Sequence, residues 1–425
     1  MRARRAWCLY DWANSAFATT VMAAMFPPFF RELAVAAGRG EADATALWGY
    51  VTAGSLLLTA LVSPPLGALA DARGDRKRRL AWLAGSGAVL TMAMAFLGGS
   101  QWQAAALLFT GASLAFSLSI VCYEALLPHL ASGPELDALS ARAYGLGYAG
   151  GGLLLVLNLA WVLKPAWFGL DGAGQAVRLS FVSVGLWWAL FTLPLLRHVP
   201  EPPVSGAPVG IVAAFGRLRA TFGEIRRYRD LSLFLGAYWV YNDGIGTIVK
   251  MATAFGAEQG ITLTHLIGAL VVTQAVGIPC SYGFAAVARR VGARPLVLGA
   301  LAGYTLVAVG ALFLRTATHF YLLAAAVGVV QGGAQALSRS LFASMVPRHR
   351  AAEFFGFFGA SGRLAGVVGP LVFGLTAQAA GTSRVGVASL VVFFVAGGWL
   401  LWRVDPATGA AAARRAEAEA AGAAP

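Results

Sequence analysis

The sequence GALADARGDRKRRL, residues 67–80, separates two long apolar segments and carries five basic and two acidic residues. Such a charged loop between two segments that can each cross a bilayer indicates a membrane hairpin. Gly67 permits the close approach of another helix. Asp71 can pair with a cation or cap the predicted helix that starts near residue 353, since helix N-termini favour anions.

The composition extends this interpretation to the whole chain. Of 425 residues, 58% are hydrophobic and 12% are charged, and the mean hydropathy is +0.69. Soluble proteins contain about 25% charged residues, so a soluble domain is excluded. Strand-length segments of alternating polarity, which would indicate a β-barrel, are not visible. The fold class predicted is therefore an all-α membrane protein.

Twelve apolar segments are long enough to cross a bilayer. Their approximate limits are 6–30, 46–70, 80–99, 103–127, 141–163, 177–196, 231–255, 264–288, 295–314, 319–342, 353–379 and 384–402. The first lacks a small-residue cleavage site, so we interpret it as a retained helix.

The distribution of basic residues predicts the orientation of these segments. With the N-terminus in the cytoplasm, 24 of the 32 Lys and Arg residues lie on the inner side and 7 on the outer side, and Arg363 lies within a segment. The positive-inside rule therefore places both termini in the cytoplasm and the protein in the plasma (inner) membrane. The net charge of +13 follows from the same rule, and no nucleic-acid partner is expected.

The chain divides into four parts. We expect a six-helix bundle over residues 1–196, a basic cytoplasmic linker over 197–230, a second six-helix bundle over 231–404 and a mobile cytoplasmic tail over 405–425. The second part of the linker has the pattern of an amphipathic helix on anionic headgroups; a solvated linker is the alternative.

The two bundles resemble each other in sequence. RAYGLGYAGGGL, residues 142–153, matches EFFGFFGASGRL, residues 353–364, at an offset of 211, and a proline precedes each match at Pro128 and Pro347. The basic loop at 67–80 is echoed by GFAAVARRVGARP, residues 283–295. Two six-helix repeats in parallel topology are typical of the major facilitator architecture.

The loop at 67–80 also resembles the signature loop of the major facilitator superfamily, although Ala72 and Asp75 occupy positions where that signature has arginine. YDWANSAFATTVMAAMFP (10–27), YNDGIGTI (241–248), VQGGAQALSRSLFASMVP (330–347) and EFFGFFGASGRLAGVVGPLVFG (353–374) resemble the vacuole-effluxer family of that superfamily. The resemblance implies a transporter, and the family's best-known fungal member exports amino acids from the vacuole. At Glu124 the family is expected to have an amide, so the chain departs from it there.

Charged side chains within the apolar segments mark candidate functional positions, because such groups are costly in lipid. In this architecture the first, fourth, seventh and tenth helices line a central cavity, and Asp11, Glu124, Asp243 and Arg339 fall on these four. The predicted substrate-binding residues are Asn14, Asn242, Asp243, Gln331, Gln335 and Arg363. The predicted coupling or gating residues are Asp11, Gly67, Asp71, Arg73, Arg76 and Glu124.

Several of these residues have structural alternatives. Asp243 and Arg363 could form a charge pair within the second bundle. Glu124 could pair with Arg73 or Arg76. The amides of Asn14, Gln331 and Gln335 could bond between helices.

The sequence predicts a secondary transporter that works by alternating access, with a small-molecule substrate such as a neutral amino acid and a coupling proton carried by Asp11, Glu124 or Asp243. Efflux of amphiphilic compounds or drugs is the alternative within transport, and a membrane sensor or scaffold is the alternative from another class. Since no catalytic pattern, metal motif or cofactor motif is found, we expect a non-enzymatic protein without cofactor or metal, and a monomer.

Overall fold

The computed structural model describes residues 2–39, 41–202, 228–261, 263–380 and 383–422. Most of the linker, including its predicted amphipathic helix, lies outside the described residues. The first half of the chain forms α1 (Arg2–Ala16), η1 (Phe17–Met25), α2 (Phe26–Ala36), α3 (Glu41–Arg73), α4 (Arg76–Ala93), α5 (Trp102–Glu124), α6 (Leu127–Leu130), α7 (Pro134–Leu163) and α8 (Ala173–His198). The second half forms α10 (Arg229–Glu258), α11 (Leu263–Val291), α12 (Ala293–Ala311), α13 (Ala317–Ser344), η4 (Arg348–Arg350), α14 (Ala351–Ala380), α15 (Ser383–Trp402) and α16 (Pro406–Gly422).

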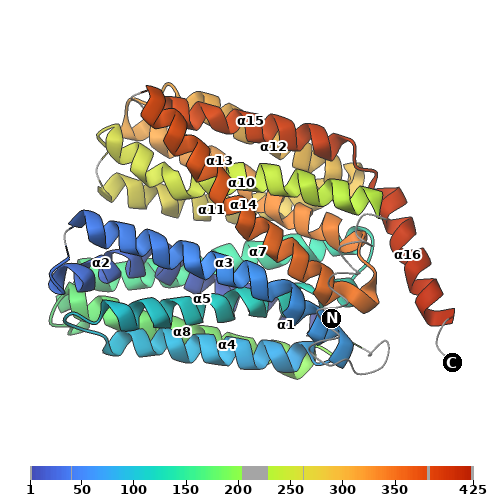
Figure 1. Cartoon of the computed structure of the whole chain (residues 1–425), viewed down its shortest axis with the longest axis horizontal. Helices are drawn as coiled ribbons and strands as arrows, with labels where there is room; N and C mark the ends of the chain where they lie inside the picture. The colour runs from blue at the N-terminus through green and yellow to red at the C-terminus, as the bar shows by residue number, and fades with distance from the viewer. Residues whose placement is uncertain (1, 40, 203–227, 262, 381–382, 423–425) are drawn as a thin grey trace.

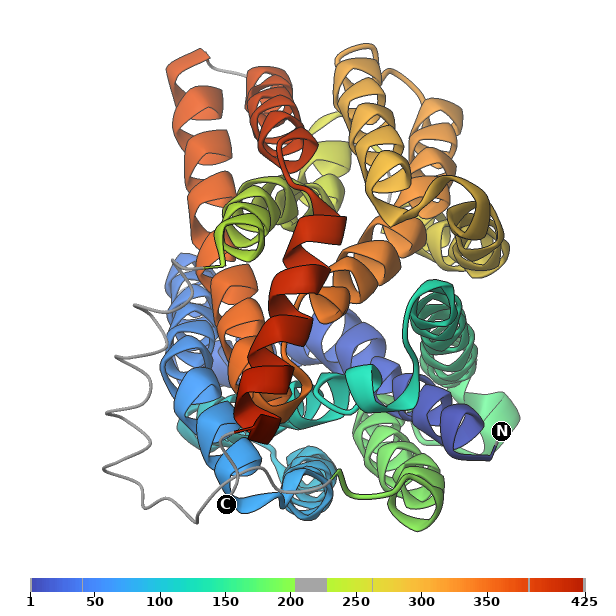
Figure 2. The same ribbon diagram turned by 90° about the vertical axis from the view of Figure 1, so that its right-hand side faces the viewer.

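These helices form two bundles, and the prediction of twelve membrane helices in two six-helix bundles is confirmed. Figure 1 shows the first half below the second, with both chain ends on the right; Figure 2 views the molecule from that end. We call this end the terminal side. Within the described ranges, nine helices are long and apolar enough to cross a membrane. The other three predicted spans, at α1–α2, α10 and α14, carry Asp11, Asp243 and Arg363.

The first span is not a regular α-helix. Its middle part, η1, is a π-helix, a form that often occurs at functional sites. Pro27 and Pro28 follow directly and lack the N–H groups that would bond to the carbonyls of Ala23 and Ala24. The backbone of this span is therefore locally irregular at the depth where the two halves face each other.

Two helices related by the sequence repeat, α7 and α14, make most of the contacts between the halves. From the first half, α7 packs against α11 and α13; from the second half, α14 packs against α3 and α5. Gly145 of α7 lies against the Tyr282 ring, and its repeat equivalent Gly356 of α14 lies against the Ser63 carbonyl. A Cβ atom at Gly145 would come within 2.8 Å of Tyr282, and one at Gly356 within 2.7 Å of Ser63 O. The repeated glycines thus permit the close helix contacts across the halves.

The C-terminal tail, for which we expected mobility, contains a helix. Residues Pro406–Gly422 form α16, which packs against α10, α13 and η4. The side chain of Asp405 starts this helix by accepting hydrogen bonds from Ala407 N and Thr408 Oγ1. An Ala-rich segment behind such a cap has high helix propensity, which explains the helix.

Candidate functional site

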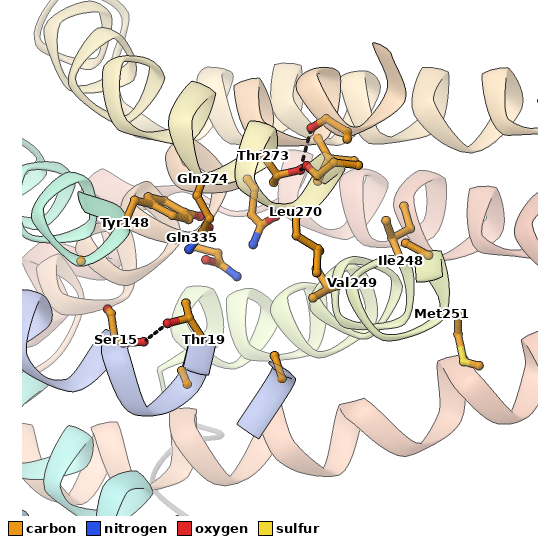
Figure 3. A pocket seen from close by; sticks show the side chains of 18 of the residues that line it. Ser15, Thr19, Tyr148, Ile248, Val249, Met251, Leu270, Thr273, Gln274 and Gln335 are labelled. Atoms are coloured by element: carbon orange, nitrogen blue, oxygen red, sulfur yellow. Dashed lines mark hydrogen bonds between the residues drawn. The ribbon is translucent and has the colours of Figure 1, made fainter. Parts of the chain in front are cut away.

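A cavity of about 480 Å³ lies between the two halves. Its polar wall includes six side chains: Asp11, Asn14, Glu124, Gln331, Gln335 and Arg339. The wall elsewhere is largely apolar, with residues such as Ile248, Val249, Leu270 and Phe320. Figure 3 shows Gln274 and Gln335 beside Tyr148, facing Ser15 and Thr19 of the first span. Five of these six side chains were among the predicted positions: Asp11, Asn14, Glu124, Gln331 and Gln335.

The cavity is also lined by helices that the sequence analysis did not assign to it. Besides α1, α5, α10 and α13, it is lined by α7 and α11, and by Val307 of α12 and Val387 of α15. The last two helices, the ninth and twelfth spans, carry no charge in their membrane part. Since an apolar side chain fits both lipid and an apolar cavity wall, the sequence could not separate these environments.

Arg339 is the central charged group of the site. The residue is 2% exposed, and its Nη1 lies 3.1 Å from Asp11 Oδ2. Its Nε donates to Ser140 Oγ and its Nη2 to Ser140 O, each at 2.8 Å. The guanidinium also lies 4.2 Å from the centre of the Tyr144 ring and 5.1 Å from that of Trp7. A cation on the second half is thus held by groups that all come from the first half.

Asp11 is fixed from its own half as well. Tyr123 OH donates to Asp11 Oδ2 at 3.1 Å, and Trp7 Nε1 donates to the Tyr123 carbonyl at 3.0 Å. The rings of Trp7 and Tyr123 are stacked with their centres 4.4 Å apart. This arrangement orients the carboxylate toward Arg339 across the boundary between the halves.

Glu124 lines the same cavity and is 8% exposed. Arg76, one of the partners considered for it, instead bonds to Asp71 and His129. Among the side chains that the structure describes, the charged residues that line the cavity are Asp11, Glu124 and Arg339. With both carboxylates ionised, these three described side chains carry one net negative charge.

Asp71 makes both contacts that its position in the sequence suggested. Its carboxylate accepts hydrogen bonds from Ala352 N at 3.1 Å and Glu353 N at 2.7 Å, at the start of α14. Its Oδ1 also accepts from Arg76 Nε at 2.7 Å. Gly67, one turn earlier, packs so closely on the Ala352 carbonyl that a Cβ atom would overlap it. These contacts and the Arg339–Asp11 pair close the terminal side of the molecule.

The remaining predicted residues lie elsewhere. Asp243 is 2% exposed and faces α14, where its Oδ2 accepts from Gly369 N at 2.7 Å; it is not among the residues that line the cavity. Asn242 lies beside Gly362 of α14. Arg73 is exposed at the end of α3. The side chain of Arg363 lies outside the described residues, so its role stays a prediction.

Sequence reasoning missed several residues of the site. Arg339 was recognised as a charge in the tenth segment but received no role, and its partners Ser140 and Tyr144 were not singled out. An arginine within a membrane helix requires a partner, so Arg339 could have indicated a charge pair in the site. Gln274 and Tyr148 gave no comparable signal, because isolated amides and phenols are common in membrane helices.

Comparisons with known proteins bear on this arrangement. The family model described as "Vacuole effluxer Atg22 like" matches residues 1–138 and 134–414. The chain is 37% identical over 393 residues to a Bacillus subtilis protein described as the uncharacterized MFS-type transporter YxiO, and the alignment covers 92% of each chain. It is 29% identical over 266 residues to Autophagy-related protein 22 of Pyricularia oryzae, which covers 56% of this chain and 38% of the fungal protein.

Solved structures show the same architecture. The human organic anion transporter MFSD10 (TETRAN) superposes with a TM-score of 0.73 at 16% identity, over 94% of this chain and 99% of that one. At this identity the likeness concerns the fold alone.

Proposed function

The chain belongs to the vacuole effluxer family of major facilitator transporters, a multi-pass membrane family whose members are not enzymes, and from this premise we propose that it exports a zwitterionic solute such as a neutral amino acid. The observation that carries the proposal is the cavity between the halves, whose wall includes Arg339, two carboxylates and several amides.

The chemistry of the cavity suits both ends of a zwitterion. A substrate carboxylate can compete with Asp11 for the Arg339 guanidinium, since arginine binds carboxylates through paired N–H groups. Asp11 or Glu124 can then receive the substrate ammonium. Gln331 and Gln335 supply further polar contacts, as does the buried Asn14 Nδ2, which has no hydrogen-bond partner among the described residues.

The closure of one side supports alternating access. The Asp71 contacts with α14 and the Arg339–Asp11 pair join the halves at the terminal side, while the cavity extends from that layer toward the opposite ends of the helices. A substrate carboxylate that draws Arg339 away from Asp11 would weaken this closure. Binding and opening of the terminal side are coupled in this way.

We further propose that transport is coupled to protons through Asp11 or Glu124. Among the described side chains, Asp11, Glu124 and Arg339 carry one net negative charge, which favours the entry of either a proton or an ammonium group into the cavity. Asp243 lies outside the cavity, so we assign it no part in this step. The excess of basic residues on the terminal side supports a location of both termini in the cytoplasm and of the protein in the plasma (inner) membrane.

Reconstituted vesicles provide the test, with radiolabelled leucine as the probe. We expect leucine transport that responds to an imposed pH gradient and that is lost in Arg339→Gln. Either Asp11→Asn or Glu124→Gln should abolish the response to the pH gradient. Asp171→Asn, which changes an exposed acid in a loop, serves as the matched control. Absence of leucine transport, together with no thermal stabilisation by any neutral amino acid, would reject the zwitterion proposal.

A second candidate function is the efflux of amphiphilic cations. The largely apolar wall, with Ile248, Leu270 and Phe320, together with one net negative charge favours it. Transport of a lipophilic cation such as tetraphenylphosphonium that leucine does not inhibit would support this candidate instead.

A further inference from the structure

Helix α14 contains a break in its backbone hydrogen bonding at Pro370. Proline has no N–H group, so the carbonyl of Gly366 lacks the donor that a regular α-helix supplies four residues later. In the structure, Lys250 Nζ of α10 donates to this carbonyl at 3.1 Å. A side chain from a neighbouring helix thus replaces the missing backbone donor.

The same turn is held at a second point by Asp243. The backbone N–H of Gly369 donates to Asp243 Oδ2 at 2.7 Å. Asp243, Thr247 and Lys250 lie at positions i, i+4 and i+7 of α10 and so share one face. A Cβ atom at position 369 would come within 2.7 Å of Asp243 Oδ1 and would collide with the Thr247 hydroxyl, so only glycine fits there.

The break divides α14 into two parts with different surroundings. The first part packs on α3, and its N-terminal N–H groups bond to Asp71 of the first half. The second part contains Phe373, which lines the cavity. The turn at 366–370 therefore lies between the contact that closes the terminal side and the cavity wall.

We propose that Lys250 and Asp243 are positioning residues that stabilise the open turn of α14 at 366–370. Lys250 satisfies the carbonyl freed by Pro370, and Asp243 binds the N–H of Gly369. Together they set the angle between the part of α14 that packs on α3 and the part that lines the cavity. The proposal concerns the conformational step of transport and is independent of the transported solute.

A double-mutant cycle with Pro370→Ala tests the role of Lys250, because alanine restores the backbone donor to Gly366. The measurement is hydrogen exchange of peptides that cover residues 364–372, in the purified full chain. We expect Lys250→Met to accelerate exchange there about tenfold in the wild-type background and less than about twofold in the Pro370→Ala background. Lys250→Arg should retain protection, since it keeps a donor. Lys164→Met, which removes an exposed lysine far from the turn, is the matched control.

The role of Asp243 is tested in the same assay. Asparagine can still accept from Gly369 N, whereas leucine cannot, so exchange should accelerate in Asp243→Leu and much less in Asp243→Asn. Equal effects of Lys250→Met in both backgrounds would overturn the proposal, as would unchanged exchange in both Lys250→Met and Asp243→Leu.

The effect of the turn on the arrangement of the two halves is tested by measuring how readily a reagent reaches the cavity. The Ala24→Cys variant, in a chain whose three native cysteines are replaced by serine, reports this access through its rate of maleimide labelling. We expect Lys250→Met to change the labelling rate at least about threefold and Lys164→Met to leave it unchanged. An unchanged rate in Lys250→Met would show that the turn does not influence the two halves.

Discussion

The guanidinium of Arg339 in the second half contacts the carboxylate of Asp11 in the first, with 3.1 Å between Arg339 Nη1 and Asp11 Oδ2. The two residues are 328 positions apart in the chain. Arg339 is nearly fully buried and Asp11 is 13% exposed. The pair therefore joins the two bundles in a region of low dielectric constant, at the floor of the cavity.

Removal of one partner should destabilise the protein more than removal of both. Arg339→Met leaves a buried carboxylate without its cation, which costs about 3 to 5 kcal/mol for buried pairs. The double variant Asp11→Asn with Arg339→Met should recover part of this loss. Thermal unfolding of the purified protein measures both. Arg78→Met removes an exposed arginine as a control, and strictly additive losses would contradict the prediction.

A methyl group at position 67 should prevent closure of the terminal side. Gly67→Ala would overlap the carbonyl of Ala352 and force α3 away from α14. A cysteine introduced near this contact should then react faster with a reagent added from the terminal side. Gly54→Ala lies in the same helix with no neighbour within 4 Å, so it is the matched control. Equal labelling rates in the two variants would show that the contact is not needed for closure.

Loss of the Asp71 carboxylate should remove the hydrogen-bond acceptor at the N-terminus of α14. It should also leave Arg76 without the carboxylate that pairs with it. We expect Asp71→Ala to lower stability by about 3 kcal/mol and Asp71→Asn by less, because asparagine still accepts from a backbone N–H. Thermal unfolding separates the two variants. Asp75→Ala breaks the more exposed pair with Arg79 and should cost at most about 1 kcal/mol. If Asp75→Ala had the larger effect, the assignment of Asp71 would fail.

Stability should fall on acidification because of His349, which lies outside the membrane helices in η4. Burial, and then the neighbouring Arg350, lower the pKa of His349. The folded state thus prefers the neutral ring, and its stabilisation is present above the unfolded pKa of about 6.5 and is lost as the pH falls below that value. Thermal unfolding at pH 7.5 and 5.5 should show a smaller difference in His349→Gln than in wild type. His319→Gln, exposed at the start of α13, should keep the wild-type difference.

The helix α16 should stabilise the adjacent loop at the terminal side. Glu417 Oε1 accepts from Arg348 N at 2.7 Å, and Gly409 packs on Met345. Glu417→Ala is expected to lower stability by about 1 kcal/mol, as for the loss of a helix cap. Glu419→Ala, which changes an exposed acid two residues later, is the control. Equal unfolding temperatures for both variants would argue against this contact.

The sequence by itself determined the membrane class, the twelve spans, the twin halves and the identity of the charged positions. Long apolar segments and a three-to-one charge asymmetry are strong local signals, so predicted limits such as 384–402 agree with α15 at Ser383–Trp402. Asp71 could be assigned to the start of α14 because an acid at the end of a helix has few ways to be satisfied.

Tertiary structure alone decided which polar groups meet. A helix that is apolar on all sides has no stripe to show which way it faces, so the sequence could not tell that Asp243 faces α14 while Gln335 faces the cavity. The pairing of Arg339 with Asp11 depends on the packing of two bundles whose helices are far apart in the chain. The hydrogen bond that stabilises the turn at Pro370 could likewise not be predicted from the sequence, because its donor, Lys250, comes from another helix.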